Sequence, residues 1–207
     1  MPAPSRRPYA ARMSPEDRRR QLLDAALRII IRDGYGAVSI ETIAREVDVS
    51  RPVIYGVFDG IGDLLGALLD RQERRALAQL SAALPAVPGD RDPGDFVVGF
   101  VRSMVDVVAN DPDTWYPVLL PPDGTPSVVR ERIDRDRERV REQFEALLAW
   151  ALERGGATAG VDLELASHSL LVVVEQWGRL VLSDPQSFTA DRLAGFVERF
   201  LAGLNDA

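Results

Sequence analysis

Apolar residues recur every three or four positions along most of the chain, which is the spacing of an amphipathic helix, and no alternating strand pattern competes with it. The segment at residues 189–204 shows this spacing most completely. Its apolar residues are Leu193, Phe196, Val197, Phe200, Leu201 and Leu204. The sequence therefore predicts an all-α protein of about nine helices.

The first three expected helices have clear boundaries. Ser14 can cap the first helix, a proline follows it, and Gly34 ends the helix. Ser39 can cap a second helix and Ser50 a third, and the turn between them calls for a left-handed backbone at Asp48, which costs some strain. Two short helices joined by a tight turn have the layout of a helix-turn-helix unit.

Six further helices follow, most of them long. They are expected at residues 61–83, 95–109, 115–120, 127–154, 162–182 and 189–204. The helix at 95–109 is apolar on several sides, which indicates burial. The first half of the helix at 127–154 alternates arginines with acids, and we expect it to be a solvated face rather than a binding site.

Composition excludes several kinds of chemistry. The chain of 207 residues is 46% hydrophobic, which favours a globular core. It has no cysteine, no lysine and one histidine, which excludes disulfides, thiolate nucleophiles, Cys/His zinc sites and lysine Schiff bases. No cofactor and no metal is expected, and an enzyme is the least favoured class. No apolar run is long enough to span a membrane and no secretory signal is evident, so a cytoplasmic protein is expected.

Charge divides the chain into two parts. Residues 1–58 hold 10 arginines against 7 acids, whereas residues 59–207 hold 15 against 25. Only the first part suits a polyanion such as DNA. We expect a flexible basic arm at 1–13, a helix-turn-helix DNA-binding domain at 14–60, and a helical ligand-binding and dimerisation domain at 61–207.

The third expected helix presents side chains suited to base and phosphate contacts. Arg51 can pair with guanine, Val53 can pack on a thymine methyl group, and the Tyr55 hydroxyl can bond a phosphate. Glu41, on the second helix, either accepts a hydrogen bond from cytosine N4 or is a solvated surface acid. The complete predicted DNA-binding set is Ser39, Glu41, Thr42, Ser50, Arg51, Pro52, Val53, Tyr55 and Gly56.

A set of residues within positions 15–66 matches the N-terminal pattern of one known family. The matching residues are Leu22, Ala25, Ala26, Gly34, Ile43, Ala44, Val49, Ser50, Ile54, Tyr55, Phe58, Leu64 and Leu65. With this set the chain closely resembles the TetR family of bacterial transcriptional regulators. The resemblance implies a homodimer that binds a palindromic operator and releases it when a small molecule enters the larger domain.

The sequence departs from the family pattern after Tyr55. Gly56 and Val57 stand where the family usually has a basic or aromatic residue and then a polar one, and Ile61 and Gly62 replace the usual Lys-Glu pair. A phosphate-contacting ammonium group is therefore missing. By hypothesis the arm compensates in the minor groove, through Arg6, Arg7 and Arg12.

The larger domain is expected to hold a pocket for a small apolar or aromatic effector. Its wall would be formed by Phe96, Phe100, Met104, Trp115, Tyr116, Phe144, Trp150 and Trp177. Each of these residues, taken alone, also fits an ordinary core. His168 and Glu175, together with Arg179, lie along one face of the penultimate helix, where they would either orient the effector or belong to a dimer contact.

The resemblance also implies that the last two helices form the dimer surface, where Gly178 would allow the backbones to approach closely. The expected partners are double-stranded operator DNA, a small-molecule effector and a second copy of the chain, with no membrane. The alternative is a DNA-binding regulator of the same fold that has no effector and is controlled by a protein partner. A core that is filled at Phe100, Trp115 and Trp177 would favour this alternative.

Overall fold

The computed structural model describes residues 13–84, 90–122, 124–155 and 160–205. Within these ranges the chain forms nine α-helices and one short 3-10 turn, and it forms no strand. The elements are α1 (Pro15–Asp33), η1 (Tyr35–Ala37), α2 (Ile40–Glu46), α3 (Arg51–Tyr55), α4 (Ile61–Ala83), α5 (Pro93–Asn110), α6 (Pro112–Leu119), α7 (Ser127–Gly155), α8 (Leu163–Ser183) and α9 (Ala190–Asn205). The predicted all-α class is confirmed.

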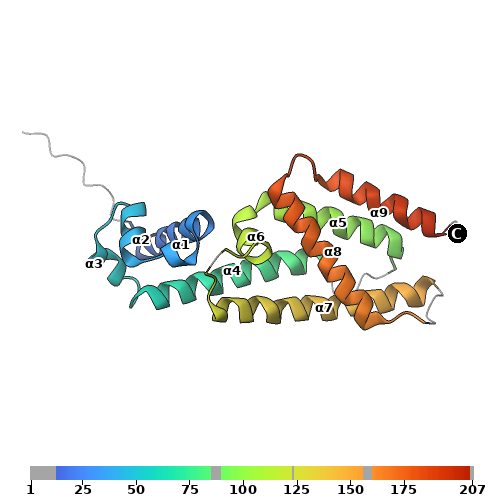
Figure 1. Cartoon of the computed structure of the whole chain (residues 1–207), viewed down its shortest axis with the longest axis horizontal. Coiled ribbons are helices and arrows are strands. Elements are labelled where there is room, and N and C mark those ends of the chain that lie inside the picture. The colour runs from blue at the N-terminus through green and yellow to red at the C-terminus, as the bar shows by residue number, and fades with distance from the viewer. Residues whose placement is uncertain (1–12, 85–89, 123, 156–159, 206–207) are drawn as a thin grey trace, which may run out of the picture.

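The helices form two groups along the long axis of the molecule. In Figure 1, α1, α2 and α3 lie at one end, and α5 to α9 lie at the other. α4 begins beside α3 and extends into the second group, so that a single helix belongs to both. α4 therefore connects the two groups of helices directly.

The first two helices start where their capping residues predict. The Ser14 hydroxyl accepts a hydrogen bond from the backbone N–H of Asp17 at 3.0 Å. Ser39 and Thr42 form a reciprocal capping box, in which each side chain bonds the backbone of the other. These bonds satisfy backbone N–H groups that have no partner within the helix.

The turn between α2 and α3 combines one confirmed prediction with one that is wrong. Asp48 has a φ of +53°, which is the left-handed conformation expected there. Ser50 occupies the capping position of α3, but among the described residues its side chain accepts no capping hydrogen bond. The start of α3 depends instead on the backbone bond from Val53 N–H to the Ser50 carbonyl, 3.0 Å long.

Two helices begin earlier than their apolar pattern predicted. α5 begins at Pro93 because the Asp92 carboxylate caps it, accepting from the N–H groups of Gly94 and Asp95. α6 begins at Pro112 rather than near residue 115, since proline at the first helical position gives up no hydrogen bond. Polar capping residues lie outside an apolar stripe, so the stripe alone places the helix start too late.

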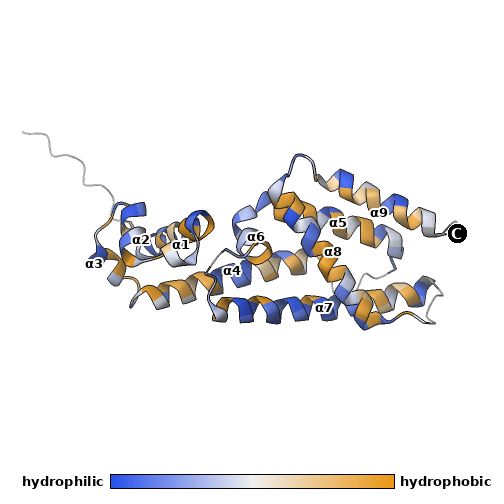
Figure 2. Ribbon diagram, in the orientation of Figure 1, coloured by the Kyte–Doolittle hydropathy of each residue, from blue (hydrophilic) through white to orange (hydrophobic). Residues whose placement is uncertain are grey.

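Two separate clusters of buried side chains hold the two groups of helices together. The first joins α1 to α3 with the start of α4, and it includes Leu22, Ile43, Ile54, Phe58 and Leu64. The second joins α5 to α9 with the end of α4, and it includes Phe100, Met104, Trp115, Phe144 and Val181. Figure 2 shows the mixed hydropathy of α4, whose apolar residues contribute to both clusters.

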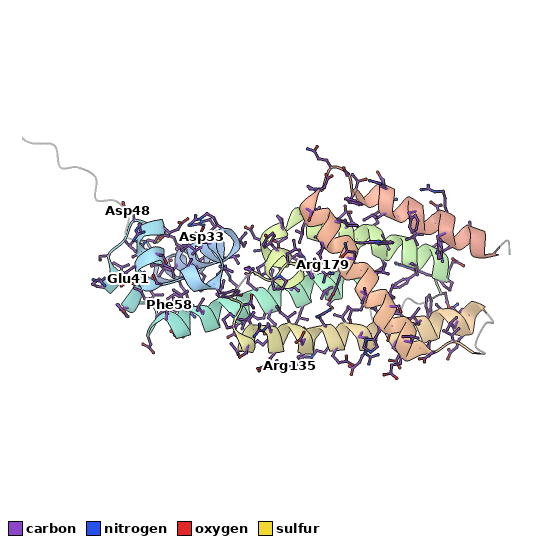
Figure 3. All side chains as sticks on the ribbon, in the orientation of Figure 1. Asp33, Glu41, Asp48, Phe58, Arg135 and Arg179 are labelled. Carbon is purple, nitrogen blue, oxygen red and sulfur yellow. The ribbon has the colours of Figure 1, made fainter. Side chains whose placement is uncertain are left out.

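The charged first half of α7 is not only a solvated face, and that prediction is corrected. Arg132 bonds Asp70 and Glu73 of α4 at 2.5 and 2.9 Å. Arg137 forms two hydrogen bonds with Glu175 of α8, at 2.5 and 2.8 Å. These long side chains connect α7 to its neighbours, whereas Arg135 points away from the bundle (Figure 3).

Gly178 also has a role different from the predicted one. It is buried, and a Cβ atom at this position would lie 2.6 Å from Cδ1 of Leu119. The missing side chain therefore lets α6 pack closely against α8 within one chain, rather than allowing two subunits to approach. Among the described helices, none is both long and apolar enough to cross a lipid bilayer.

Candidate DNA-reading surface and effector cavity

The short helix α3 is held from behind by apolar contacts. Ile54 has no exposed surface and Phe58 is 2% exposed, while the Arg19 guanidinium lies 4.4 Å from the centre of the Phe58 ring. On the opposite side, the side chains of Val53 and Tyr55 are 37% and 57% exposed. The helix therefore presents an exposed outer face on a buried apolar support.

The structure places most of the predicted DNA-binding residues on this outer face. Those that are exposed are Glu41, Ser50, Arg51, Pro52, Val53, Tyr55 and Gly56. Ser39 and Thr42 are only partly exposed, and their hydroxyl groups are engaged in the capping box of α2. Thr42 also donates to the Ala37 carbonyl at 2.9 Å, so its side chain positions α2 rather than extending outward.

An ion pair connects the two helices of the turn on the same face. Nη1 of Arg51 donates to Oε1 of Glu41 at 2.9 Å, although both side chains are more than half exposed. A hydrogen bond from its own backbone N–H, and then the Arg51 side chain, hold the pKa of the Glu41 carboxyl below its usual value. No local sequence pattern connects the two residues, because they lie ten positions apart and meet only through the turn.

The start of α4 lies next to this surface. Gly60 has a φ of +152°, and Gly62 is exposed with open space where a side chain would be. The Asp63 carboxylate accepts from the Asp59 N–H at 3.1 Å, so an acid already occupies part of this helix terminus. Arg6, Arg7 and Arg12, which were expected to compensate for the missing lysine, lie outside the described residues.

A cavity of about 520 Å³ lies between the two groups of helices and within the second. Its volume is in the range of small-molecule binding sites. Of the predicted effector-binding residues, Phe100, Met104, Trp115, Glu175 and Trp177 line it. The core is therefore not filled at Phe100, Trp115 and Trp177.

The other predicted wall residues lie elsewhere, and their assignment is corrected. Phe96 packs edge-on against Trp150 at 5.7 Å between ring centres, and Phe144 packs edge-on against Phe100 at 5.8 Å. Tyr116 lies on α6 outside the cavity lining, and His168 is exposed on α8. Phe96, Trp150 and Phe144 belong to the aromatic core behind the wall.

Most of the cavity lining is aliphatic, with a charged rim where α4, α7 and α8 meet. The rim includes Glu73, Arg132, Asp136, Arg137 and Glu175. Its arginines are already bonded to carboxylates of neighbouring helices. Burial, and then the neighbouring Glu73 carboxylate, raise the pKa of Asp136 above its usual value. An occupant of the cavity would therefore meet an apolar wall and a rim whose charges are largely paired.

The orientation of Trp115 in the wall is fixed by a chain of hydrogen bonds. Its indole N–H donates to Gln79 at 2.8 Å, and Gln79 donates to the Asp111 carboxylate at 2.6 Å. Asp111 also accepts from Thr114 and pairs with Arg75. Such a network holds one rotamer of the indole against α4.

Three lining residues come from the first group of helices, and they were not among the predicted effector-binding residues. Leu27 and Ile30 of α1 and Tyr35 of η1 all face the cavity. Burial raises the pKa of the Tyr35 hydroxyl above its usual value. Leu27 and Ile30 follow the helical spacing of a core stripe, so nothing in the sequence distinguished them from residues that pack only against α2 and α3.

Comparisons with known proteins agree with this geometry. Residues 22–68 match the family model described as bacterial regulatory proteins of the tetR family. This N-terminal region belongs to the TetR family. Proteins of this family are transcriptional regulators.

Two curated relatives extend the match. The chain is 27% identical over 173 residues to the uncharacterized HTH-type transcriptional regulator Rv0472c of Mycobacterium tuberculosis; the match covers 84% of the chain and 66% of that relative, just under two thirds. Over 76 residues it is 38% identical to the nicotine-responsive transcriptional repressor HdnoR of Paenarthrobacter nicotinovorans, which is 37% of each chain.

A solved structure shows the same fold over nearly the whole chain. It is the transcriptional regulator FadR of Bacillus subtilis in complex with stearoyl-CoA, with a TM-score of 0.65 and 17% identity. The similarity covers 88% of the chain and 96% of FadR. At this identity the comparison shows a shared fold and nothing more.

The last two helices, α8 and α9, carry exposed apolar side chains. These side chains are Leu165, Val172, Val173, Phe196 and Phe200, which are between 41% and 64% exposed. Phe196 packs edge-on against Trp177 and stacks on Phe200, so the aromatic side chains form a continuous surface. Contiguous exposed apolar side chains are typical of an interaction surface.

Proposed function

We propose that the chain is a ligand-responsive repressor that binds a palindromic operator as a homodimer and is released by a mainly apolar small molecule. The observation that carries the proposal is the cavity of about 520 Å³, whose wall includes α1, η1 and α4 as well as α5 to α8. An occupant would contact the helices that support the DNA-reading surface and those of the larger group at the same time.

The DNA-reading role is assigned to the exposed face of α2 and α3. Arg51 would donate to a guanine, Val53 would pack on a thymine methyl group, and Tyr55 would bond a phosphate. The DNA would also contact the backbone and surface of Ser50, Pro52 and Gly56. The predicted arm at residues 1–13 would add contacts in the minor groove.

The homodimer is assigned to the apolar face of α8 and α9. Two copies of this face can pack as a four-helix bundle around a two-fold axis, which would remove Phe196 and Phe200 from water. The same axis would relate the two α3 helices and set the spacing of the operator half-sites. A regulator of this kind acts on the chromosome, which supports the expected cytoplasmic location.

The effector is assigned to the cavity. Its aliphatic wall suits a molecule with a substantial apolar body, and its paired rim charges leave no isolated arginine for a strongly anionic head group. The relative HdnoR is named nicotine-responsive, and FadR was solved with stearoyl-CoA, which supports a small-molecule effector. The open cavity favours this function over a regulator that has no effector and is controlled by a protein partner.

The proposed mechanism is a shift between two conformations. A molecule in the cavity would stabilise a conformation in which α1 and α4 change position, so that the two α3 helices no longer fit successive major grooves. A coupling free energy of about 1 to 3 kcal/mol would change operator affinity about 5- to 150-fold. The two domains that were expected to meet near residue 60 would then share the wall of the cavity.

The proposal is tested by selecting bound fragments from the source genome with purified protein. The selected operator is then used in binding assays with candidate effectors that include stearoyl-CoA, free fatty acids and nicotine. We expect a palindromic site and at least one compound that lowers its affinity. A protein that binds compounds in the cavity while its operator affinity never changes would contradict the ligand-responsive mechanism.

A further inference from the structure

The ion pair between Glu41 and Arg51 has a consequence for operator sequence, and the inference rests on the proposed operator reading. Glu41 is the second residue of α2 and Arg51 is the first residue of α3. Their 2.9 Å bond crosses the turn on the face that would meet DNA. Figure 3 shows Glu41 at the end of the molecule that lies furthest from α9.

Arg51 keeps donors available for a base while it is bound to Glu41. A guanidinium group has five N–H donors, and Glu41 occupies one of them on Nη1. A bidentate contact with guanine O6 and N7 needs two parallel donors, which the remaining N–H groups can supply. The ion pair and the guanine contact can therefore exist together.

Glu41 is itself well held at this position. It lies in the first turn of α2, where the helix dipole favours a negative charge. Its backbone N–H, and then the Arg51 side chain, favour the ionised carboxylate and lower the pKa of Glu41. Because the capping box holds the start of α2, the backbone that carries Glu41 is fixed relative to that helix.

The charges favour the pair over two independent contacts. A single carboxylate facing DNA would be repelled by the phosphates, and a single long arginine would have to be ordered when it binds. The pair removes the net negative charge and restricts the guanidinium before DNA arrives. Preorganisation of this kind increases the difference in affinity between a matching base and a mismatched one.

We propose that Glu41 is a positioning residue that holds Arg51 against the guanine of one G·C pair in each operator half-site, so that the two side chains read this position as one unit. The base preference then belongs to Arg51, and its strength depends on Glu41. This assignment replaces the two separate contacts, guanine to Arg51 and cytosine to Glu41.

The experiment is selection from a randomised palindromic DNA library, followed by affinity measurements on the selected site and its single-base variants at fixed salt. The proteins compared are wild type, Glu41→Ala, Arg51→Ala and the double variant. Glu46→Ala is the matched control. It removes the same charge from the other end of α2, where Glu46 pairs with Arg28 and Arg32 instead of with α3. Thermal unfolding of each variant establishes that it is folded.

We expect the wild type to prefer guanine at one position of each half-site by about 5- to 150-fold. Arg51→Ala should abolish this preference. Glu41→Ala should reduce it at least threefold without weakening binding to unrelated DNA, and Glu46→Ala should leave it unchanged. The double variant should show no greater loss of preference than Arg51→Ala alone.

Several results would overturn the inference. One is a guanine preference that survives Glu41→Ala, and another is a guanine preference that is unaffected by Arg51→Ala. A third is a cytosine preference that depends on Glu41 but persists in Arg51→Ala, which would make Glu41 an independent reader. A stronger guanine preference in Glu41→Ala would show that Glu41 sequesters Arg51. If the wild type selects no sequence at all, the proposed operator reading itself fails.

Discussion

Filling the cavity from within the chain tests whether its occupancy controls DNA binding. Ala76 lies on α4, is 9% exposed and lines the cavity. Ala76→Leu adds three carbon atoms to the wall at a place where empty space is available. Since leucine is nearly as good a helix former as alanine, the change has little direct effect on α4.

The expected gain in stability follows from the added apolar surface. At about 0.8 kcal/mol for each buried methylene group, three carbons give about 2 kcal/mol. For a chain of this size, that corresponds to an increase in Tm of about 4 to 8 °C. If the added atoms met packed side chains instead of a void, overpacking would cost about 1 to 3 kcal/mol, and Tm would fall.

The same change should act as a permanent partial effector. We expect operator affinity to fall by up to about 150-fold, the upper end of typical coupling. Thermal unfolding followed by circular dichroism and operator binding followed by fluorescence anisotropy measure the two effects. Ala82→Leu, an exposed position on the same helix, is the control and should change neither quantity. A raised Tm with unchanged operator affinity would refute the coupling, and a lowered Tm would refute the existence of usable space at Ala76.

Three other changes test separate parts of the molecule. Deletion of residues 1–13 should weaken operator binding and flatten its dependence on salt, because arginine contacts with phosphates release counterions; equal salt slopes for both proteins would contradict the role of the arm. The pair Phe196→Asp and Phe200→Asp should convert the dimer into monomers in analytical ultracentrifugation while each chain stays folded, whereas a persistent dimer would place the interface elsewhere. Asp136→Asn should raise Tm at neutral pH, because burial raises the pKa of this carboxyl in the folded state. Ionisation of Asp136 therefore lowers the free energy of unfolding. This loss is absent below the pKa of Asp136 in the unfolded chain, and it grows as the pH rises through its pKa in the folded chain. The difference in Tm between this variant and wild type should shrink toward pH 3, and a constant difference would show that ionisation is not the cause.

The architecture follows from local features that a sequence displays directly. Helical spacing of apolar residues and the caps at Ser14 and Ser39 act over a few positions, so they predict the helices without knowledge of the packing. The exposure of Arg51 and Tyr55 follows in the same way, because Ile54 must face inward on so short a helix. These elements were predicted correctly for that reason.

The composition of the cavity wall could not be predicted in this way. Phe96, Phe100 and Phe144 all have the spacing of buried residues, yet only Phe100 borders the cavity, because the difference depends on how far apart whole helices pack. The contribution of Leu27 depends likewise on the angle between α1 and the larger group. The bond between Glu41 and Arg51 depends on the geometry of a turn that no local pattern specifies.

The placement of the tryptophans gives the chain a built-in optical reporter. The sequence has three, and Trp115 and Trp177 border the cavity while Trp150 lies behind the wall. A molecule that enters would change the surroundings of two indole rings, so its arrival should alter the intrinsic emission of the unlabelled protein. Screening for the natural effector can therefore begin with a fluorimeter, before any operator is known.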